Sequence, residues 1–105
     1  MAELTSPFWG RYKMNMHFVY MLQSENYKYL YIGSTNDLER RLKEHNSGRV
    51  FVTSKHKPLR VVYYESYLSK KDAFDREMKL KHHGSTIGHL KKRVKNSLLP
   101  PKGRG

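Results

Sequence analysis

The segment HFVYMLQSENYKYLYIG, residues 17–33, decides the fold of this 105-residue chain. Its two ends, HFVYML at 17–22 and YLYIG at 29–33, are rich in aliphatic and aromatic side chains, and a polar break separates them. Such a pair of runs predicts an antiparallel β-hairpin with a longer loop. A third run of this kind, RVVYYESY at 60–67, predicts one more strand. The sequence therefore predicts a small three-stranded antiparallel sheet.

Three other stretches have helical periodicity. Residues 36–46 predict a helix that is capped by Thr35 or Asn36 and stopped near Gly48. Residues 69–83 begin with a capping-box pattern. Residues 87–98 predict a last helix with an apolar side made of Ile87, Leu90, Val94 and Leu98. The predicted order is β-β-α-β-α-α, an α+β domain with about three helices packed on the sheet.

Composition limits the class of protein. The chain has 21 Lys and Arg against 9 Asp and Glu, a formal charge of +12, and no acidic residue follows Glu77. Such a charge favours polyanions, so we expect nucleic acid, and DNA first, as the partner. The absence of cysteine excludes disulfides and thiolate zinc sites. No apolar run approaches the roughly 18 residues of a membrane span, so we expect a cytoplasmic protein.

The domain is expected at residues 16–98. Residues 1–15 lack the apolar centre of a secretory signal and are expected to be a loose extension. Residues 99–105 are expected to be a disordered basic tail, because Pro100 and Pro101 end helical structure.

Two predicted helices direct an ionisable group toward the core. Glu77 shares an apolar stripe with Ala73, Phe74 and Leu80. Arg41 shares an arc with Leu38, Leu42 and His45. A buried carboxylate needs a partner, and Arg41 is the first candidate. This pattern indicates a site, whereas a structural ion pair of Glu77 with Arg41 or Lys81 is the alternative.

Two tyrosine motifs lie one hairpin apart, FVY at 18–20 and YIG at 31–33, and GSTNDLERRL follows at 33–42. Together with Thr53, Pro58 and Glu77 they resemble the GIY-YIG nuclease family. The resemblance covers roughly residues 17–98. It looks most like small stand-alone members related to the N-terminal catalytic domain of the excinuclease C subunit. It implies the GIY-YIG nuclease fold and a phosphodiesterase that uses one divalent cation.

The resemblance also implies a role for each candidate residue. Glu77 would bind Mg²⁺ or Mn²⁺, since Mg²⁺ often takes one or two carboxylates and otherwise water and phosphate. Arg41 would clamp the scissile phosphate. Tyr20 and Tyr31 would activate water, although strand packing alone also explains tyrosines there and which of them is the base stays open. His45 would hydrogen-bond a tyrosine or the phosphate or accept a proton, whereas a core histidine is the commoner alternative.

Further residues are candidates for contact with nucleic acid, namely Ser34, Lys43, Thr53, Lys55, Lys91, Lys92 and Arg93. Ser34 departs from excinuclease-like members, which carry a lysine there that could lower the pKa of a tyrosine. The activity is therefore expected to be weaker, unless a base such as Lys43 or Lys55 substitutes. The six histidines form no HExxH motif, so a zinc site is not expected.

Three hypotheses follow. The first is a metal-dependent endonuclease that hydrolyses DNA by single-metal, water-mediated attack. Its expected substrates are repair or recombination intermediates, and a partner protein could direct it to them. The second is a non-catalytic nucleic-acid-binding module on the same fold. The third is a basic RNA-associated protein whose ion pair is structural. The structure of the substrate, sequence specificity and oligomeric state stay open.

Overall fold

The predicted hairpin forms the centre of the fold. The computed structural model describes residues 8–9, 12–13, 15–26 and 28–99. Strand β3 (His17–Ser24) pairs antiparallel with β4 (Leu30–Thr35) on one side and with β5 (Leu59–Tyr67) on the other. The order β4-β3-β5 makes β4 an edge strand. The predicted three-stranded antiparallel sheet is confirmed.

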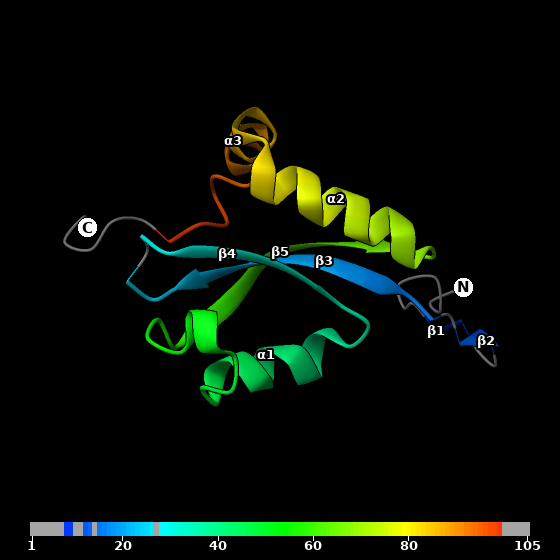
Figure 1. Cartoon of the computed structure of the whole chain (residues 1–105), viewed down its shortest axis with the longest axis horizontal. Helices are drawn as coiled ribbons and strands as arrows, with labels where there is room; N and C mark the ends of the chain where they lie inside the picture. The colour runs from blue at the N-terminus through cyan, green and yellow to red at the C-terminus, as the bar shows by residue number, and fades with distance from the viewer. Residues whose placement is uncertain (1–7, 10–11, 14, 27, 100–105) are drawn as a thin grey trace.

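Helices cover both faces of this sheet. Helix α1 (Leu38–Asn46) and the short 3₁₀ helix η2 (Phe51–Thr53) lie on one face, and α2 (Lys70–His82) and α3 (Gly84–Arg93) lie on the other (Figure 1). The α+β order predicted from the sequence is therefore confirmed, with the sheet as the middle layer.

The strands alternate between the two layers, as their period of two requires. Val19 and Met21 of β3 pack toward α2 and α3, where Ala73, Leu80, Leu90 and Val94 complete one core. Tyr20 and Leu22 point to the other face, where they pack with Leu59 and the apolar side of α1. The two tyrosines of the family motifs, Tyr20 and Tyr31, thus share the α1 face.

Three sequence predictions about the helices were wrong in detail. The N-cap of α1 is Asp37, whose carboxylate accepts a hydrogen bond from the Arg40 amide, and neither Thr35 nor Asn36. Helix α3 begins at Gly84 and not at residue 87, because the extended backbone of His83 alone separates it from α2. It ends at Arg93, and turns continue to residue 97.

Phe74 was predicted to lie in the core, yet it is 54% exposed. Ala73, Glu77 and Leu80 are spaced three or four residues apart and form the buried stripe of α2. Phe74 lies one position past Ala73 and therefore falls at the margin of this stripe.

The ends of the chain lie mostly outside the described residues. Within the predicted extension, β1 (Phe8–Trp9) pairs with β2 (Tyr12–Lys13) as a short antiparallel ribbon. Of the predicted tail, Leu99 is described, and its amide donates a 2.6 Å hydrogen bond to the side chain of Gln23. No helix in the described part of the chain is long and apolar enough to cross a membrane.

Candidate active site around the edge of β4

The candidate residues meet around the free edge of β4. Tyr20, Arg41 and His45 lie on the α1 side of the sheet, whereas Glu77 lies on the α2 side. Ser34 and Tyr31 of β4 point to opposite faces and connect the two groups. Side chains from the two faces of the sheet therefore come close to one another at this edge.

A buried hydrogen-bond chain runs through the α1 side. The Tyr20 hydroxyl lies 2.8 Å from Nε2 of His45, and Nδ1 of His45 lies 2.7 Å from the hydroxyl of Thr53. The Thr53 hydroxyl donates to the carbonyl of Val50, so it accepts the Nδ1 proton of His45. Nε2 is then the acceptor, and the Tyr20 hydroxyl donates to it. His45 and Thr53 are both 0% exposed, which fixes this arrangement.

Burial sets the protonation of both groups. Desolvation raises the pKa of Tyr20 to about 12, although a hydrogen bond from Arg41 acts in the opposite direction. Burial and then the Arg41 cation lower the pKa of His45, against a smaller effect of Glu44. At neutral pH the pair is therefore a phenol that donates to a neutral imidazole.

Gly33 makes room for the tyrosines. It is the cross-strand partner of Tyr20, and a Cβ on it would lie 2.5 Å from the Tyr20 hydroxyl oxygen and 2.9 Å from Cε2 of Tyr31. Both distances are far below van der Waals contact. The Tyr31 ring in turn lies 6.3 Å from the Tyr20 ring and 5.1 Å from the His45 ring, between centroids.

Arg41 does not pair with Glu77, in contrast to the prediction. Its Nη1 lies 2.9 Å from the Glu44 carboxylate, and its guanidinium also hydrogen-bonds Tyr20. The side chain is 34% exposed and remains accessible from solvent. Arg41 therefore links the buried Tyr20 to the surface of the site.

Glu77 is buried as predicted, with 8% exposure, but its partners come from other elements. The Ser34 hydroxyl donates a 2.6 Å hydrogen bond to Oε1, and Lys81 Nζ lies 2.8 Å from Oε2. The alternative ion pair with Lys81 is thus present. Lys81 Nζ also lies 5.5 Å from the centre of the Tyr31 ring. This residue was missed as a site residue, although its i,i+4 spacing from Glu77 placed it on the same helix face.

The donors around Glu77 suit a hard cation. A carboxylate and a hydroxyl offer oxygen ligands, and a cation, the Lys81 ammonium, already lies against Oε2. Within the described residues, no group of three or more His, Cys, Asp or Glu side chains could hold a metal. Any metal at Glu77 would therefore take its remaining ligands from water and substrate, as Mg²⁺ commonly does.

The other predicted contacts with nucleic acid are scattered. Thr53 is fully buried in the chain to His45 and does not face solvent. Lys43 and Lys55 are exposed. Lys91, Lys92 and Arg93 lie at the end of α3, in the layer opposite to α1 (Figure 1). The structure does not bring these lysines into the cluster around Tyr20.

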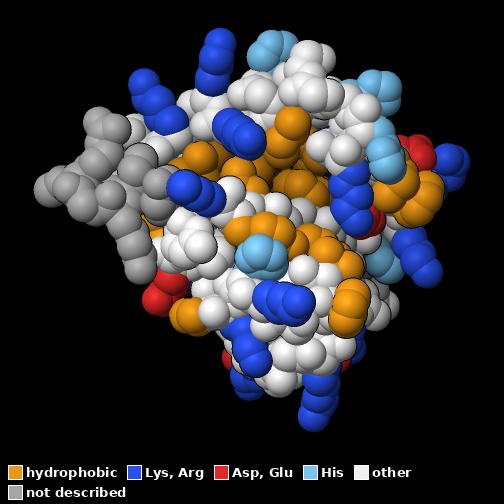
Figure 2. Space-filling model, turned by 60° about the vertical axis from the view of Figure 1, so that its left-hand side comes forward, with side chains coloured by type: hydrophobic (Ala, Val, Ile, Leu, Met, Phe, Trp, Pro, Cys, Tyr) orange, Lys and Arg blue, Asp and Glu red, His pale blue; other side chains and the backbone are white. Residues whose placement is uncertain are grey.

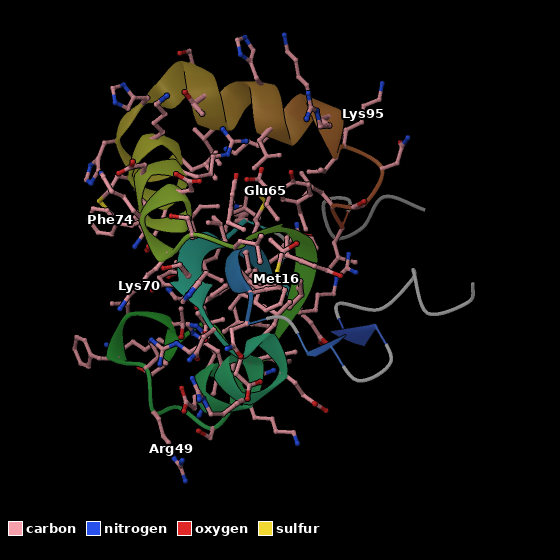
Figure 3. All side chains as sticks on the ribbon, turned by 90° about the vertical axis from the view of Figure 1, so that its right-hand side faces the viewer. Met16, Arg49, Glu65, Lys70, Phe74 and Lys95 are labelled. Carbon is pink, nitrogen blue, oxygen red and sulfur yellow. The ribbon has the colours of Figure 1, made fainter. Side chains whose placement is uncertain are left out.

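A second ionic cluster lies under α2 and was not predicted. The Glu65 carboxylate accepts hydrogen bonds from Tyr63, Tyr67 and the guanidinium of Arg76. Burial acts to raise the pKa of Glu65, but these hydrogen bonds outweigh it and the pKa is lowered. Glu65 lies in the middle of the molecule, whereas Lys70 and Phe74 lie together at one edge (Figure 3). Among the described residues no buried side-chain polar atom lacks a hydrogen-bond partner, and this cluster links β5 to α2.

Comparison with known proteins identifies the family of this chain. A family model described as the GIY-YIG catalytic domain matches residues 16–92. A UPF0213 protein of Lactococcus lactis subsp. cremoris is 38% identical over 90 residues, which are 85% of this chain and 90% of that protein. A UPF0213 protein of Clostridium perfringens is 39% identical over 67 residues, 63% of this chain and 71% of that protein. The NMR structure of a UPF0213 protein from Bacillus halodurans, 29% identical, covers 75% of this chain and 86% of its own, with a TM-score of 0.48. The chain therefore belongs to the GIY-YIG catalytic domain family.

Proposed function

We propose that this protein is a Mg²⁺-dependent endonuclease that hydrolyses phosphodiester bonds of DNA, with repair or recombination intermediates as substrates. Family membership supports nuclease chemistry and a nucleic acid substrate. One observation carries the proposal: an accessible guanidinium, a phenol with a buried proton acceptor and a buried carboxylate meet around one sheet edge.

Arg41 is the group that would hold the scissile phosphate. Its guanidinium is 34% exposed, so a phosphate can reach it, and a planar fork of donors matches two phosphate oxygens. The Glu44 carboxylate now occupies part of this fork. The phosphodiester monoanion would compete for the same donors, and the extra negative charge that develops in the trigonal-bipyramidal transition state would gain more from them.

The pair of Tyr20 and His45 would move the proton of the attacking water. The phenol of Tyr20, with a pKa of about 12, stays protonated at neutral pH and is a poor free base. It can instead accept a proton from water while its own proton passes to Nε2 of His45, 2.8 Å away. The water oxygen bonds to phosphorus, the bond to the leaving oxygen breaks, and that oxygen takes a proton from solvent. Thr53 holds Nδ1 throughout.

Glu77 and Ser34 would hold the cation. A Mg²⁺ ion there would neutralise charge on the phosphate as it is attacked. Ser34 contributes by holding Oε1 of Glu77 at 2.6 Å, which fixes the direction of the carboxylate. In the protein alone Lys81 supplies the compensating charge.

The surface supports an anionic substrate. Lys and Arg side chains far outnumber Asp and Glu on the face seen in Figure 2, in line with the formal charge of +12 of the whole chain. A long-range positive potential of this kind attracts DNA without reading its sequence. We therefore propose low sequence specificity.

The test is incubation of the purified protein with labelled single-stranded, duplex and branched DNA, in Mg²⁺, in Mn²⁺ and in EDTA. We expect metal-dependent cleavage that is lost in Glu77→Ala and Arg41→Ala. Matched controls are Glu39→Ala and Arg49→Ala, which remove the same charges at exposed positions. Cleavage that persists in a folded Glu77→Ala variant would rule out Glu77 as the metal ligand.

Two observations favour a second candidate, a nucleic-acid-binding module without catalysis. Ser34 stands where excinuclease-like members have a lysine, and Lys81 satisfies Glu77 without any metal. This candidate predicts equal DNA binding in EDTA and Mg²⁺ and no cleavage of any of the three DNA forms. The same incubation, read by gel shift as well as by cleavage, separates the two candidates.

A further inference from the structure

A cavity opens beside the candidate active site, between the N-terminal ends of α1 and α2. Its volume is about 380 Å³, and its lining includes Ser34, Asn36, Arg40, Arg41, Lys70 and Phe74. This volume is in the range of about 300 to 1,000 Å³ that is typical of small-molecule sites. It is therefore large enough for one nucleoside unit.

The cavity has an aromatic wall. Phe74 is 54% exposed, although it belongs to the second turn of a well-formed helix. Lys70 precedes it by four residues, so the two side chains lie on the same face of α2, as Figure 3 also shows. A phenylalanine ring next to an ammonium can stack with a base while the ammonium contacts its phosphate. The exposed part of the Phe74 side chain is therefore open to a ligand in the cavity.

The cavity is also electropositive. Three of its described lining residues are cations, Arg40, Arg41 and Lys70, and none of the described ones is a carboxylate. Arg40 Nη2 donates a 3.2 Å hydrogen bond to Oδ1 of Asn36, and its Nε lies 3.5 Å from the Glu44 carboxylate, which does not line the cavity. The cavity faces the N-terminal ends of two helices, where the helix dipoles favour an anion. An anionic occupant is therefore favoured over a neutral or cationic one.

The cavity is continuous with the candidate active site, and this indicates which ligand would occupy the cavity. Ser34 and Arg41 belong both to the cavity and to the site around β4. A DNA strand whose scissile phosphate lies on Arg41 would place an adjacent nucleotide in the cavity. The next phosphate along the strand would then reach Arg40 or Lys70.

We propose that this cavity is a subsite for the nucleotide next to the scissile phosphate, with its base stacked on Phe74 and its phosphate on Arg40 and Lys70. The proposal rests on the proposed function, because that function places the scissile phosphate on Arg41. Since stacking accepts every base, the subsite contributes affinity and strand position without sequence specificity.

The test uses binding in EDTA, so that it does not depend on cleavage. A fluorescently labelled single-stranded oligonucleotide is titrated against the wild-type protein and variants, and ¹⁵N NMR spectra are recorded with an unlabelled tetranucleotide. We expect Phe74→Ala and Phe74→Leu to weaken binding by at least about fivefold, and Phe74→Trp to retain it, because stacking requires an aromatic ring. The tetranucleotide should shift the amide signals of Ser34, Asn36, Lys70 and Phe74.

Leu68→Ala is the matched control, since Leu68 is 66% exposed, lies just before α2 and does not line the cavity. It should bind as wild type does. Equal affinity in wild type and Phe74→Leu, or signal shifts confined to other surfaces, would overturn the subsite. Metal-dependent cleavage by the wild type is a separate result, so loss of the subsite and loss of the nuclease are distinguishable.

Discussion

Tyr20 and Gly33 are cross-strand partners, and a single Cβ on residue 33 would lie 2.5 Å from the Tyr20 hydroxyl oxygen. The hydroxyl cannot move away without cost, since it donates its proton to His45, a residue that is 0% exposed. The glycine of the YIG motif is thus required by the position of the tyrosine in the first motif. The two motifs form one structural unit.

We predict that Gly33→Ala disrupts the site. The added methyl must displace the Tyr20 ring or spread the hairpin, and overpacking of this kind costs about 1 to 3 kcal/mol of unfolding free energy. Urea unfolding measures this loss. Cleavage should fall at least as far as in Tyr20→Phe, because the hydroxyl leaves its place between Arg41 and His45.

Gly88→Ala is the matched control for this substitution. Gly88 lies in α3, and a Cβ there would meet no atom within 4 Å. Alanine in a helix interior stabilises by roughly 0.5 to 1 kcal/mol over glycine, so this variant should be more stable and equally active. A folded Gly33→Ala protein with unchanged activity would contradict the close contact.

Tyr20→Phe and Tyr31→Phe should separate the two tyrosines. Removal of the Tyr20 hydroxyl leaves Nε2 of the buried His45 without its donor, at a cost of about 1 to 3 kcal/mol. The Tyr31 ring is only partly buried, and its replacement should change stability much less. We expect cleavage to depend strongly on Tyr20, and urea unfolding together with cleavage of branched DNA measures both effects. Equal losses of stability in the two variants would argue against the chain from Tyr20 to Thr53.

The spacing of apolar residues correctly predicted the features that lie within a single helix or strand. The hairpin prediction correctly placed Tyr20 and Tyr31 on neighbouring strands, and helical spacing correctly buried Glu77 and His45. Such patterns specify which face of a helix or strand is buried, but they do not specify which residue of another element contacts it. The proposed partner of Glu77 was therefore wrong: Arg41 belongs to a helix on the opposite face of the sheet, whereas Lys81 lies one turn away on the same helix.

Phe74 and Glu65 show two other limits of prediction from the sequence. Phe74 satisfies the apolar period of α2, but the width of the buried stripe depends on how much of the helix the sheet covers, which the sequence does not state. The cluster around Glu65 was predictable in part. Tyr63, Glu65 and Tyr67 alternate along β5 and so share a face, which is a signal that a polar network lies beneath α2.

The stability of the protein should fall as the pH falls below about 6.5. Burial lowers the pKa of His45 in the folded state below its ordinary value near 6.5, so the unfolded chain binds the proton more readily. The unfolded state gains protons first on acidification, and the free energy of unfolding decreases from about pH 6.5 down to the folded pKa. Urea unfolding between pH 7.5 and 5.0 measures this slope. The slope should shrink in His45→Asn, and an unchanged slope would assign it to other histidines.

The rate of cleavage should also depend on the titration of His45. His45 can accept the Tyr20 proton only as a neutral imidazole, so the rate should rise with pH through the lowered pKa of His45 and reach a plateau near neutrality. Rates with a fixed branched substrate from pH 5.0 to 8.0 test this. A rate that keeps rising in proportion to hydroxide up to pH 8.0 would indicate a base other than the pair of Tyr20 and His45.

Lys81→Met should change how the protein depends on metal. In the protein alone Lys81 Nζ supplies the positive charge at Oε2 of Glu77, at 2.8 Å, and Ser34 occupies Oε1. Without the ammonium, a carboxylate that is 8% exposed retains one hydrogen bond, which should cost about 1 to 3 kcal/mol of stability in EDTA. A divalent cation can replace the ammonium, so Mn²⁺ should raise the thermal midpoint of Lys81→Met more than that of the wild type.

Lys79→Met is the control, since it removes the same charge from an exposed position of the same helix and leaves Glu77 paired. Thermal unfolding in EDTA and over a series of Mn²⁺ concentrations compares the three proteins, and electron paramagnetic resonance counts the free Mn²⁺. Lys81→Met should bind Mn²⁺ more tightly than both others, because the ion no longer displaces a salt-bridged lysine. If all three proteins bind Mn²⁺ equally, the ion does not bind at Oε2 of Glu77, and the role of this carboxylate is limited to its ion pair with Lys81.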